Sequence, residues 1–367
     1  ENANWGMMAI PVQAVYAERL DMVNRRNSYY QRREYGADMQ PIIAQTAQML
    51  GVSPDEIVFT RGATEALQGL IGGYNQLKPG DAVMFCDLDY DSMITAMKWL
   101  KDRRGVEVVS FDIPEPATRA NVLAAYEAAL TAHPNVKLLL TTHVSHRNGL
   151  VMPIAEIADM ARARGADIIV DAAHSFGQID FKLPDLNADF IGINLHKWIG
   201  APIGVGVMYV ARNRIGDIDP YMGEPDTTPP SIHARIHSGT VNFAAFLSVP
   251  KAIEVHNEIG VANKAARLQH LRNLWAEPLR DHPGVEILTP AEPDMYAGIT
   301  SFRLKGKTSA QENIALAKRL LDEFGIFTVH RTGLAHGACV RAAPSYFTTP
   351  SDVEALRKAI VSIASTT

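Results

Sequence analysis

Short apolar runs alternate with amphipathic stretches over residues 56–210. The runs are rich in β-branched and aromatic residues and are apolar at nearly every position, which is typical of strands buried on both faces. The stretches between several of them carry apolar residues at helical spacing, as in 121–132 and 153–165, where Pro153 suits a helix start and Gly165 a helix end. The pattern predicts an α/β fold in which helices sandwich a mostly parallel sheet. The expected strands are 56–60, 82–88, 106–111, 136–144, 166–173, 190–194 and 205–210.

The pattern changes after about residue 245. A long charged helix is expected over 251–281, followed by short strands at 285–288 and 299–304 and by a helix that ends at Phe324. The chain of 367 residues also exceeds what one hydrophobic core usually supports. We therefore expect a second, smaller C-terminal α+β domain. The expected division is an N-terminal segment at 1–20, a large cofactor-binding domain at 21–245 and a small domain at 246–367.

Composition narrows the range of partners. The net charge is −5 and the basic residues are scattered rather than gathered into a stripe, so nucleic acid is not an expected partner. The two cysteines, Cys86 and Cys339, have neither CxxC spacing nor a neighbouring His/Cys cluster, so neither a metal site nor a disulfide scaffold is expected. The apolar run at 190–211 is long enough to raise the question of a membrane span, but Lys197 lies near its middle and glycines and a proline interrupt it. We expect a buried strand, loop and strand there, and no membrane partner.

The first candidate site is the turn Gly62-Ala63-Thr64, between an expected strand and a helix. Small residues let the N–H groups at a helix start close on an anion, and Thr64 adds a hydroxyl. The segment fits a phosphate group. An ordinary helix N-cap with a glycine in the turn is the alternative.

The second candidate is Asp171, which stands at the carboxyl end of a wholly apolar strand, where open α/β sheets bind ligands. A buried carboxylate needs a positive partner, and a pyridinium N–H would supply one. The alternative is an aspartate that caps the following turn, with His174 as a satisfied core histidine.

The third candidate is Lys197, the only charged residue between Phe190 and Ala211. Apolar surroundings lower the pKa of a lysine, and this favours the neutral amine that forms a Schiff base. A solvated surface lysine is the alternative, but such a lysine does not usually lie within an apolar run.

Weaker candidates flank these three. Tyr90 follows an expected strand and could stack on a cofactor ring or belong to the core. Arg235, His237 and Thr240 form a polar cluster with a glycine, or a hydrated loop. Arg341 lies in an apolar segment of the small domain, where its guanidinium could clamp a substrate carboxylate or form an ion pair at the domain interface.

Taken together, these motifs resemble the class V aminotransferase family of fold-type I enzymes that depend on pyridoxal 5′-phosphate (PLP), and especially its isopenicillin N epimerase-like branch. The resemblance runs from ENANWG at the start of the chain to VRAAPSYFTTPSDVEAL near its end, so it covers nearly the whole chain. Four motifs stand in the family's order, GATE, DAAHSFGQ, HKW and the late VR…YFTTPSDVEAL.

The resemblance assigns roles to individual residues. Lys197 would carry PLP as a Schiff base, Asp171 would bond the pyridine nitrogen and His174 would lie near the phenolic oxygen of the cofactor. The family is built as homodimers with shared active sites, so a homodimer is implied. The remaining assignments are phosphate binding by Ala63, Thr64 and His196, contact of Thr240 with the phosphate of the partner subunit, ring stacking by Tyr90, and substrate carboxylate binding by Arg341. Apart from the resemblance, Arg235 of the polar cluster is a further candidate for substrate binding.

The sequence departs from the family at one cofactor contact. Many relatives have asparagine where this chain has His146, and Asn148 follows two positions later. Either His146 or Asn148 could therefore contact the phenolic oxygen of the cofactor.

The implied reaction is aminotransfer or epimerisation at the Cα of an amino-acid group, free or peptide-linked, with Lys197 as the general base. A β-eliminating lyase or a cysteine desulfurase-like enzyme is the alternative, and desulfuration is disfavoured because Cys339 stands two residues before Arg341, inside an expected strand, with no room for a mobile loop. A non-catalytic PLP-binding regulatory module would be expected to lose Lys197 or Asp171, and this chain keeps both. A nucleotide-binding enzyme would need a glycine-rich phosphate loop, which is missing where it should occur.

The opening segment is also similar to family members that tailor the glutamyl group of the siderophore pyoverdine in the periplasm. The chain opens at Glu1 without an initiator methionine. The resemblance therefore implies a removed leader, a periplasmic location and a role in siderophore biosynthesis. Without it, the compartment stays open and includes the cytoplasm.

Overall fold

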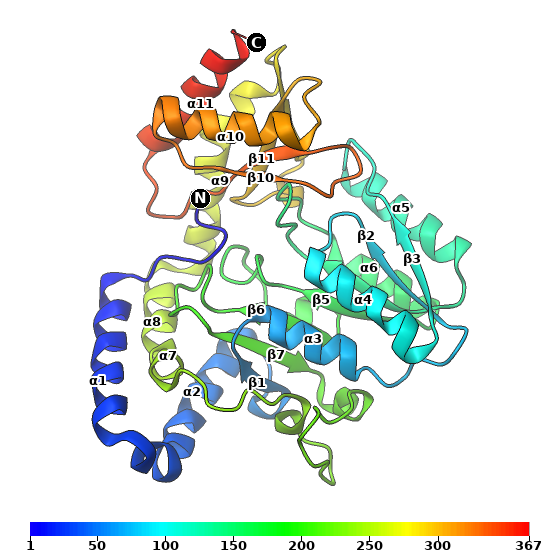
Figure 1. Cartoon of the computed structure of the whole chain (residues 1–367), viewed down its shortest axis with the longest axis vertical. Helices are drawn as coiled ribbons and strands as arrows, with labels where there is room; N and C mark the ends of the chain where they lie inside the picture. The colour runs from blue at the N-terminus through cyan, green and yellow to red at the C-terminus, as the bar shows by residue number, and fades with distance from the viewer. Residues whose placement is uncertain (367) are drawn as a thin grey trace.

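The computed structural model describes residues 1–366, and its larger sheet has seven strands (Figure 1). These are β1 (Ile57–Thr60), β2 (Ala82–Cys86), β3 (Glu107–Phe111), β4 (Val136–Thr142), β5 (Asp167–Asp171), β6 (Phe190–Asn194) and β7 (Gly206–Val210). Their order is β1-β7-β6-β5-β4-β2-β3, and β3, β2, β4, β5 and β6 run parallel. Only β7 is antiparallel to its neighbours, β6 and β1. The expected mostly parallel sheet is confirmed.

Helices cover both faces of this sheet, which explains why its strands are apolar at nearly every position. Along β5, Ile168 and Val170 pack into one cluster and Ile169 into the other, because successive side chains point to opposite faces. The second cluster includes α3 (Ala63–Gly73) and α4 (Asp91–Arg104). The first includes α1 (Ile10–Arg33), α2 (Tyr35–Leu50), α5 (Arg119–Ala132), α6 (Ile154–Ala163), α7 (Phe243–Leu247) and α8 (Val249–Ile259).

The smaller sheet is antiparallel and has the order β10-β11-β9-β8. Its strands are β8 (Val285–Ile287), β9 (Thr300–Leu304), β10 (Val329–Arg331) and β11 (Cys339–Ala342), and its helices are α9 (Val261–Ala276), α10 (Ala310–Phe324) and α11 (Pro350–Ala364). A separate core holds these elements together, with Trp275 and Phe302 edge to face at 5.7 Å. The fold is thus the expected α/β unit with a smaller C-terminal α+β part.

The prediction of a single helix over 251–281 is wrong. The chain turns at Gly260, whose φ of 81° lies in the left-handed region that favours glycine, so α8 and α9 are separate helices.

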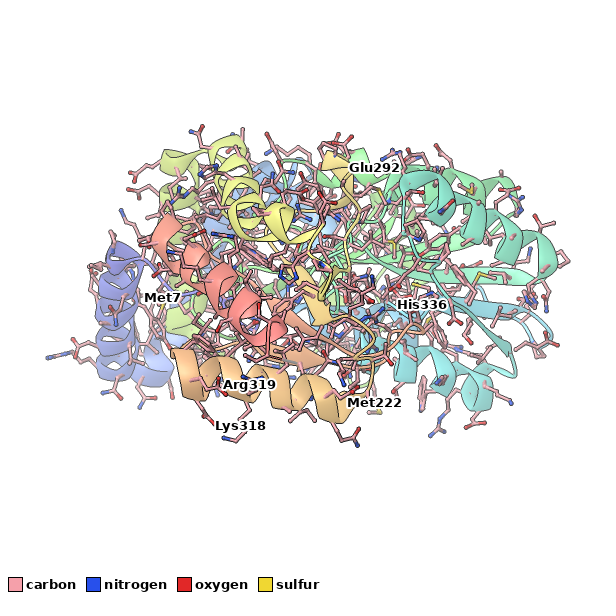
Figure 2. The ribbon with its side chains drawn as sticks, turned by 90° about the horizontal axis from the view of Figure 1, so that it is seen from above. Met7, Met222, Glu292, Lys318, Arg319 and His336 are labelled. Atoms are coloured by element: carbon pink, nitrogen blue, oxygen red, sulfur yellow. The ribbon has the colours of Figure 1, made fainter. Side chains whose placement is uncertain are left out.

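Helix α10 shows how the amphipathic pattern is used in the small unit. Leu316 and Leu320 face the core, whereas Lys318 and Arg319 point away from the molecule (Figure 2). Each of these two cations pairs with a carboxylate one turn further along the helix. The pairs keep the outer face of α10 polar.

The first six residues form a strap, which we call the N-terminal strap, between the two sheets. The backbone N–H of Asn2 donates to Ala343 O at 3.0 Å, beside the small sheet, and that of Gly6 donates to His196 O at 2.8 Å, beside the large one. In Figure 1 the N-terminus accordingly lies between the upper and lower parts of the molecule. Helix α1 follows and passes through residue 20, where the N-terminal segment was expected to end.

The apolar run at 190–211 forms β6, a loop and β7, as expected. Within residues 1–366, no helix is both long and apolar enough to cross a membrane. In the same residues, no three His, Cys, Asp or Glu side chains are grouped so that they could hold a metal ion.

We expect Gly206→Ala to destabilise the fold, because a Cβ there would lie 2.5 Å from Gly62 Cα and 2.7 Å from Ile193 O. Both neighbours are backbone, so the strand or the turn before α3 must shift, at a cost on the order of 1–3 kcal/mol. Denaturant unfolding measures this difference. Gly36→Ala is the matched control, since nothing lies within 4 Å of its added Cβ. Equal midpoints for both variants would contradict the expectation.

Candidate active site

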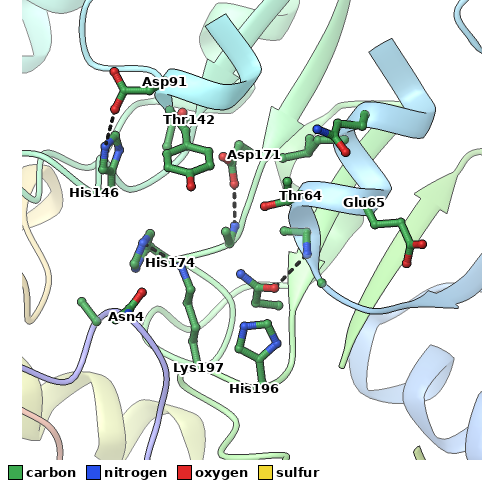
Figure 3. Close-up of a pocket in the computed structure, with 18 of the residues that line it drawn as sticks. Asn4, Thr64, Glu65, Asp91, Thr142, His146, Asp171, His174, His196 and Lys197 are labelled. Carbon is green, nitrogen blue, oxygen red and sulfur yellow. Dashed lines mark hydrogen bonds and ion pairs between the residues drawn. The ribbon is translucent and has the colours of Figure 1, made fainter. Parts of the chain in front are cut away.

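A cavity of about 540 Å³ lies at the carboxyl ends of the parallel strands, with Arg331 and Arg341 of the small sheet in its lining. Figure 3 shows residues that line it. Ligands of open α/β sheets bind at this edge. The structure brings most of the expected site residues together there. Those that line the cavity are Gly62, Ala63, Thr64, Tyr90, His146, Asp171, His174, His196, Lys197 and Arg341.

Lys197 stands in the loop after β6, with its amine 2.9 Å from His174 Nε2 (Figure 3). Burial lowers the pKa of this lysine to about 8, although the charge of Asp171 opposes the shift. Roughly a tenth of the amine is therefore uncharged and nucleophilic at pH 7, far more than for an ordinary lysine.

His174 is 6 % exposed and lies at the same end of the site. Burial, and then the charge of Lys197, hold its pKa well below the usual range, so the imidazole is neutral. A neutral imidazole 2.9 Å from the amine can hold the amine in place without adding a second positive charge.

Asp171 ends β5 and is 3 % exposed. Its Oδ1 accepts a hydrogen bond from Ala173 N at 2.9 Å, which fixes the orientation of the carboxyl group. Burial raises the pKa of Asp171, while the Ala173 N–H and Lys197 favour the charged form. Such a carboxylate is suited to a ligand N–H donor.

The start of α3 is fixed by Asn194, at the end of β6. Asn194 Oδ1 accepts from Ala63 N at 2.8 Å, so this N–H group is already bonded. Thr64 and Glu65 of the first turn line the cavity, and Thr64 is exposed. The first N–H groups of a helix have no partner within the helix and can bind an anion. His196 also lines the cavity, and its Nδ1 lies within hydrogen-bond distance of Val205 O, at 2.9 Å. The arrangement fits a phosphate at a helix start.

Tyr90 and His146 pack against each other with an interplanar angle of 88° and a centroid distance of 5.1 Å. Burial lowers the pKa of His146 to about 4, so its ring is neutral. Asp91 lies 3.7 Å from His146 and 2.6 Å from the buried guanidinium of Arg147, and these two groups hold the pKa of Asp91 below its usual range.

Three expected site residues lie elsewhere. Asn148 Oδ1 accepts from Leu150 N, and its side chain faces a different, smaller cavity. Arg235 is buried, donates to Ile215 O at 3.1 Å and pairs with Asp226. Thr240 is exposed and lies outside the cavity formed by its own chain.

Arg341 reaches the cavity wall but is already paired with a carboxylate. Glu1 Oε1 lies 2.5 Å from Nη2 and Oε2 lies 3.3 Å from Nε. The third nitrogen, Nη1, donates to His146 O at 2.7 Å. Every guanidinium nitrogen of Arg341 therefore has a partner within the chain.

Sequence reasoning missed several residues that line this cavity. Thr142 ends β4, so the rule that pointed to Asp171 would also have found it. Asn194 ends β6 in the same way. The strap residues Ala3 and Asn4, and Arg331 at the end of β10, carry no local signal, because only the packing of distant segments brings them here.

The residues present fit PLP. Three buried polar atoms at the cavity, Thr142 Oγ1, His146 Nδ1 and His174 Nδ1, have no partner within residues 1–366. Unsatisfied buried polar atoms are rare, and a polar ligand would satisfy them. The lysine amine, the buried carboxylate and the helix start match the aldehyde, the ring nitrogen and the phosphate of this cofactor.

Comparison with known proteins gives one matching family. The model of the family described as aminotransferase class-V matches residues 12–356. The isopenicillin N epimerase of Streptomyces clavuligerus is 29% identical over 334 residues, which is 86% of this chain and 81% of that protein. A cysteine desulfurase of Serratia proteamaculans is 26% identical over 327 residues, covering 86% of this chain and 76% of that protein.

Solved structures share the fold across the whole chain. The apo cysteine desulfurase of Thermococcus onnurineus NA1 has a TM-score of 0.84 at 21% identity and covers 100% of this chain and 94% of its own. The cystine C-S lyase C-DES, in complex with cysteine persulfide, has a TM-score of 0.81 at 20% identity and covers 97% of this chain and 95% of its own.

The lowered pKa of Lys197 predicts the pH dependence of cofactor uptake. Only the neutral amine attacks the aldehyde of PLP, so the uptake rate of the cofactor-free protein should rise with pH and level off above about 8 rather than near the ordinary lysine value of 10.5. Rapid-mixing absorbance measures this rate. A rate that keeps rising to pH 10 would show that the amine is not desolvated.

Proposed function

The chain belongs to the aminotransferase class-V family and uses pyridoxal 5′-phosphate as its cofactor, and from that premise we propose that it acts at the Cα of an amino-acid group, by aminotransfer or epimerisation. One observation carries the proposal. The amine of Lys197 is held by neutral His174 in the same cavity as the buried carboxylate of Asp171.

PLP, when bound, withdraws electrons from the Cα of the amino acid attached to it. Asp171 would hold a proton on the ring nitrogen of the cofactor, since its carboxyl group is buried and oriented by Ala173 N–H. Lys197, once its amine is free, accepts the Cα proton near neutral pH, because its pKa is lowered to about 8. His174 keeps that amine in position at 2.9 Å.

The cysteines favour this reaction type over desulfuration. Cys339 lies within β11 with 0 % exposure, and burial raises its pKa to about 11. Cys86 is 1 % exposed, and burial raises its pKa well above the usual value. A buried, protonated thiol cannot act as a mobile sulfur acceptor. β-Elimination needs no such thiol, and the desulfurase relatives keep it as the second candidate.

The finer proposal concerns the substrate. We propose an amino-acid group carried on a larger, peptide-like molecule, such as the glutamyl group of a pyoverdine siderophore. The polar rim of the cavity supports a substrate that extends outward, since Arg61 and Glu65 form an ion pair there and the Arg61 side chain is 62% exposed. The relationship to isopenicillin N epimerase supports it further.

Incubation with free amino acids and with glutamyl peptides tests the proposal. Aminotransfer would yield a 2-oxo acid, epimerisation would invert the configuration at Cα with uptake of deuterium from D₂O, and elimination would release the β-substituent. Lys197→Ala should lose all of these activities, because the base is gone. After borohydride reduction, the cofactor mass should lie on the peptide with Lys197 and not on the one with Lys264, whose pKa is also lowered to about 8. Label on Lys264, or no visible absorbance, would contradict the proposal.

We also propose that the enzyme works as a homodimer with shared active sites. Thr240 supports this, since it is exposed and lies outside the cavity of its own chain. Light scattering should give twice the 40.2 kDa mass of one chain. A monomer that is fully active would refute the shared site.

A further inference from the structure

A second buried lysine, Lys264, binds the loop that carries Lys197. Lys264 lies near the start of α9 and is 1% exposed. Its Nζ donates a hydrogen bond to Trp198 O at 2.8 Å, and Trp198 is the residue that follows Lys197. Lys264 does not line the cavity, so it contacts the loop from outside the site.

The ammonium of Lys264 has no carboxylate partner within residues 1–366. It contacts Trp198 O, His256 Nδ1 at 2.8 Å and the ring of Tyr346, whose centroid lies 5.1 Å from Nζ. A cation buried without an anion is unfavourable, and burial lowers the pKa of Lys264 to about 8. A methionine would fill the same space without this penalty, so packing alone does not account for an amine here.

His256 gives the ammonium a fixed direction. It lies in α8 and is 5% exposed. Burial, and then the charge of Lys264, lower the pKa of His256 to about 3, so its ring is neutral. Nδ1 of a neutral ring can accept a hydrogen bond from the ammonium. One N–H group of Lys264 is thus directed to the histidine and another to Trp198 O.

The carbonyl that Lys264 binds lies where two loops of the site meet. A Cβ added to Gly177 would lie 3.0 Å from the carbonyl carbon of Trp198 and 3.1 Å from the amide nitrogen that follows it. Gly177 stands three residues after His174, so the loops of His174 and Lys197 are in backbone contact at this point. The same two loops supply the imidazole and the amine that lie 2.9 Å apart (Figure 3).

We propose that Lys264 is a positioning residue for Lys197, and that His256 orients it. The hydrogen bond to Trp198 O holds the loop of Lys197 against the loop that carries His174, and so keeps the amine within reach of the imidazole. The inference rests on the proposed role of Lys197 as the residue that attaches the cofactor. It does not depend on which reaction follows at Cα.

Two measurements test the inference. The first is PLP uptake by the cofactor-free protein, which forms a C=N bond between the nitrogen of Lys197 and the aldehyde carbon and releases water. Only the neutral amine reacts, so the pH at which the rate levels off reports how desolvated the amine is. The second is the ratio of circular dichroism to absorbance in the visible band of the loaded protein. This ratio reports how firmly the attached group is held in one orientation.

Lys264→Met removes the donor and keeps the size of the side chain. Release of the loop lets water reach the amine of Lys197, so its pKa rises and the pH at which uptake levels off should move up by about one unit. Uptake at pH 7 should then be about tenfold slower. The visible dichroism per unit of absorbance should fall as well. Lys264→Arg keeps a charged donor and should restore part of both values.

Arg272→Met is the matched control, because Arg272 is a buried cation of the same helix. It donates to Thr289 and Thr300 and pairs with Glu277, and none of these residues lines the cavity. This variant should lower stability without moving the pH profile or the dichroism. A role in folding alone predicts the same behaviour for Lys264→Met, and that result overturns the inference.

Loss of the Lys264 charge would raise the pKa of Lys197 even if the loop did not move. The pH profile of Lys264→Met would then shift while its dichroism stayed at the parent value, and this outcome overturns the inference. If Lys264→Met does not fold, His256→Leu tests the same point, since it keeps the lysine and removes the acceptor that orients it. It should shift both readouts in the same direction by less, and no shift overturns the inference. A parent protein without a visible band overturns the proposed function instead, so the two failures can be told apart.

Discussion

The amine of Lys197 must remain partly uncharged in a buried cavity at the edge of the large sheet, and the rest of the site is arranged around this requirement. Burial lowers the pKa of the amine to about 8, but burial alone would also leave it without a hydrogen-bond partner. His174 resolves the conflict, because it is neutral for the same reason and lies within hydrogen-bond distance. Asp171 supplies the opposite charge without contacting the amine directly.

The same constraint explains why the site needs two sheets. The large sheet is covered on both faces, so a ligand reaches it at the edge where its parallel strands end. That edge supplies Asp171, Asn194 and Lys197. The small sheet closes the cavity from the other side and brings two guanidiniums to it. The cavity is thereby lined by residues of both sheets.

The N-terminal strap couples these parts. It bonds to the large sheet at His196 and to the small sheet at Ala343, and it neutralises Arg341 through Glu1. A change in the strap would therefore affect both the loop that carries Lys197 and the side chain of Arg341. Burial has the opposite effect on the thiol of Cys339 in β11. It keeps this thiol protonated, so the thiol does not take part in the reaction.

The sequence by itself determined the strands of the large sheet, because strands buried on both faces must be apolar at consecutive positions. It also determined Asp171 and Lys197, since a charged residue within or at the end of such a run has to be compensated by a ligand or a partner. It did not determine the break at Gly260, because helical spacing continues on both sides of that glycine and only the backbone dihedral separates the two helices. The pairing of Glu1 with Arg341 was decided only by the tertiary structure. These residues lie at opposite ends of the chain, and a contact between distant segments leaves no periodicity or spacing in the sequence. Arg331 could not be predicted for the same reason, because only the fold brings its side chain to the cavity.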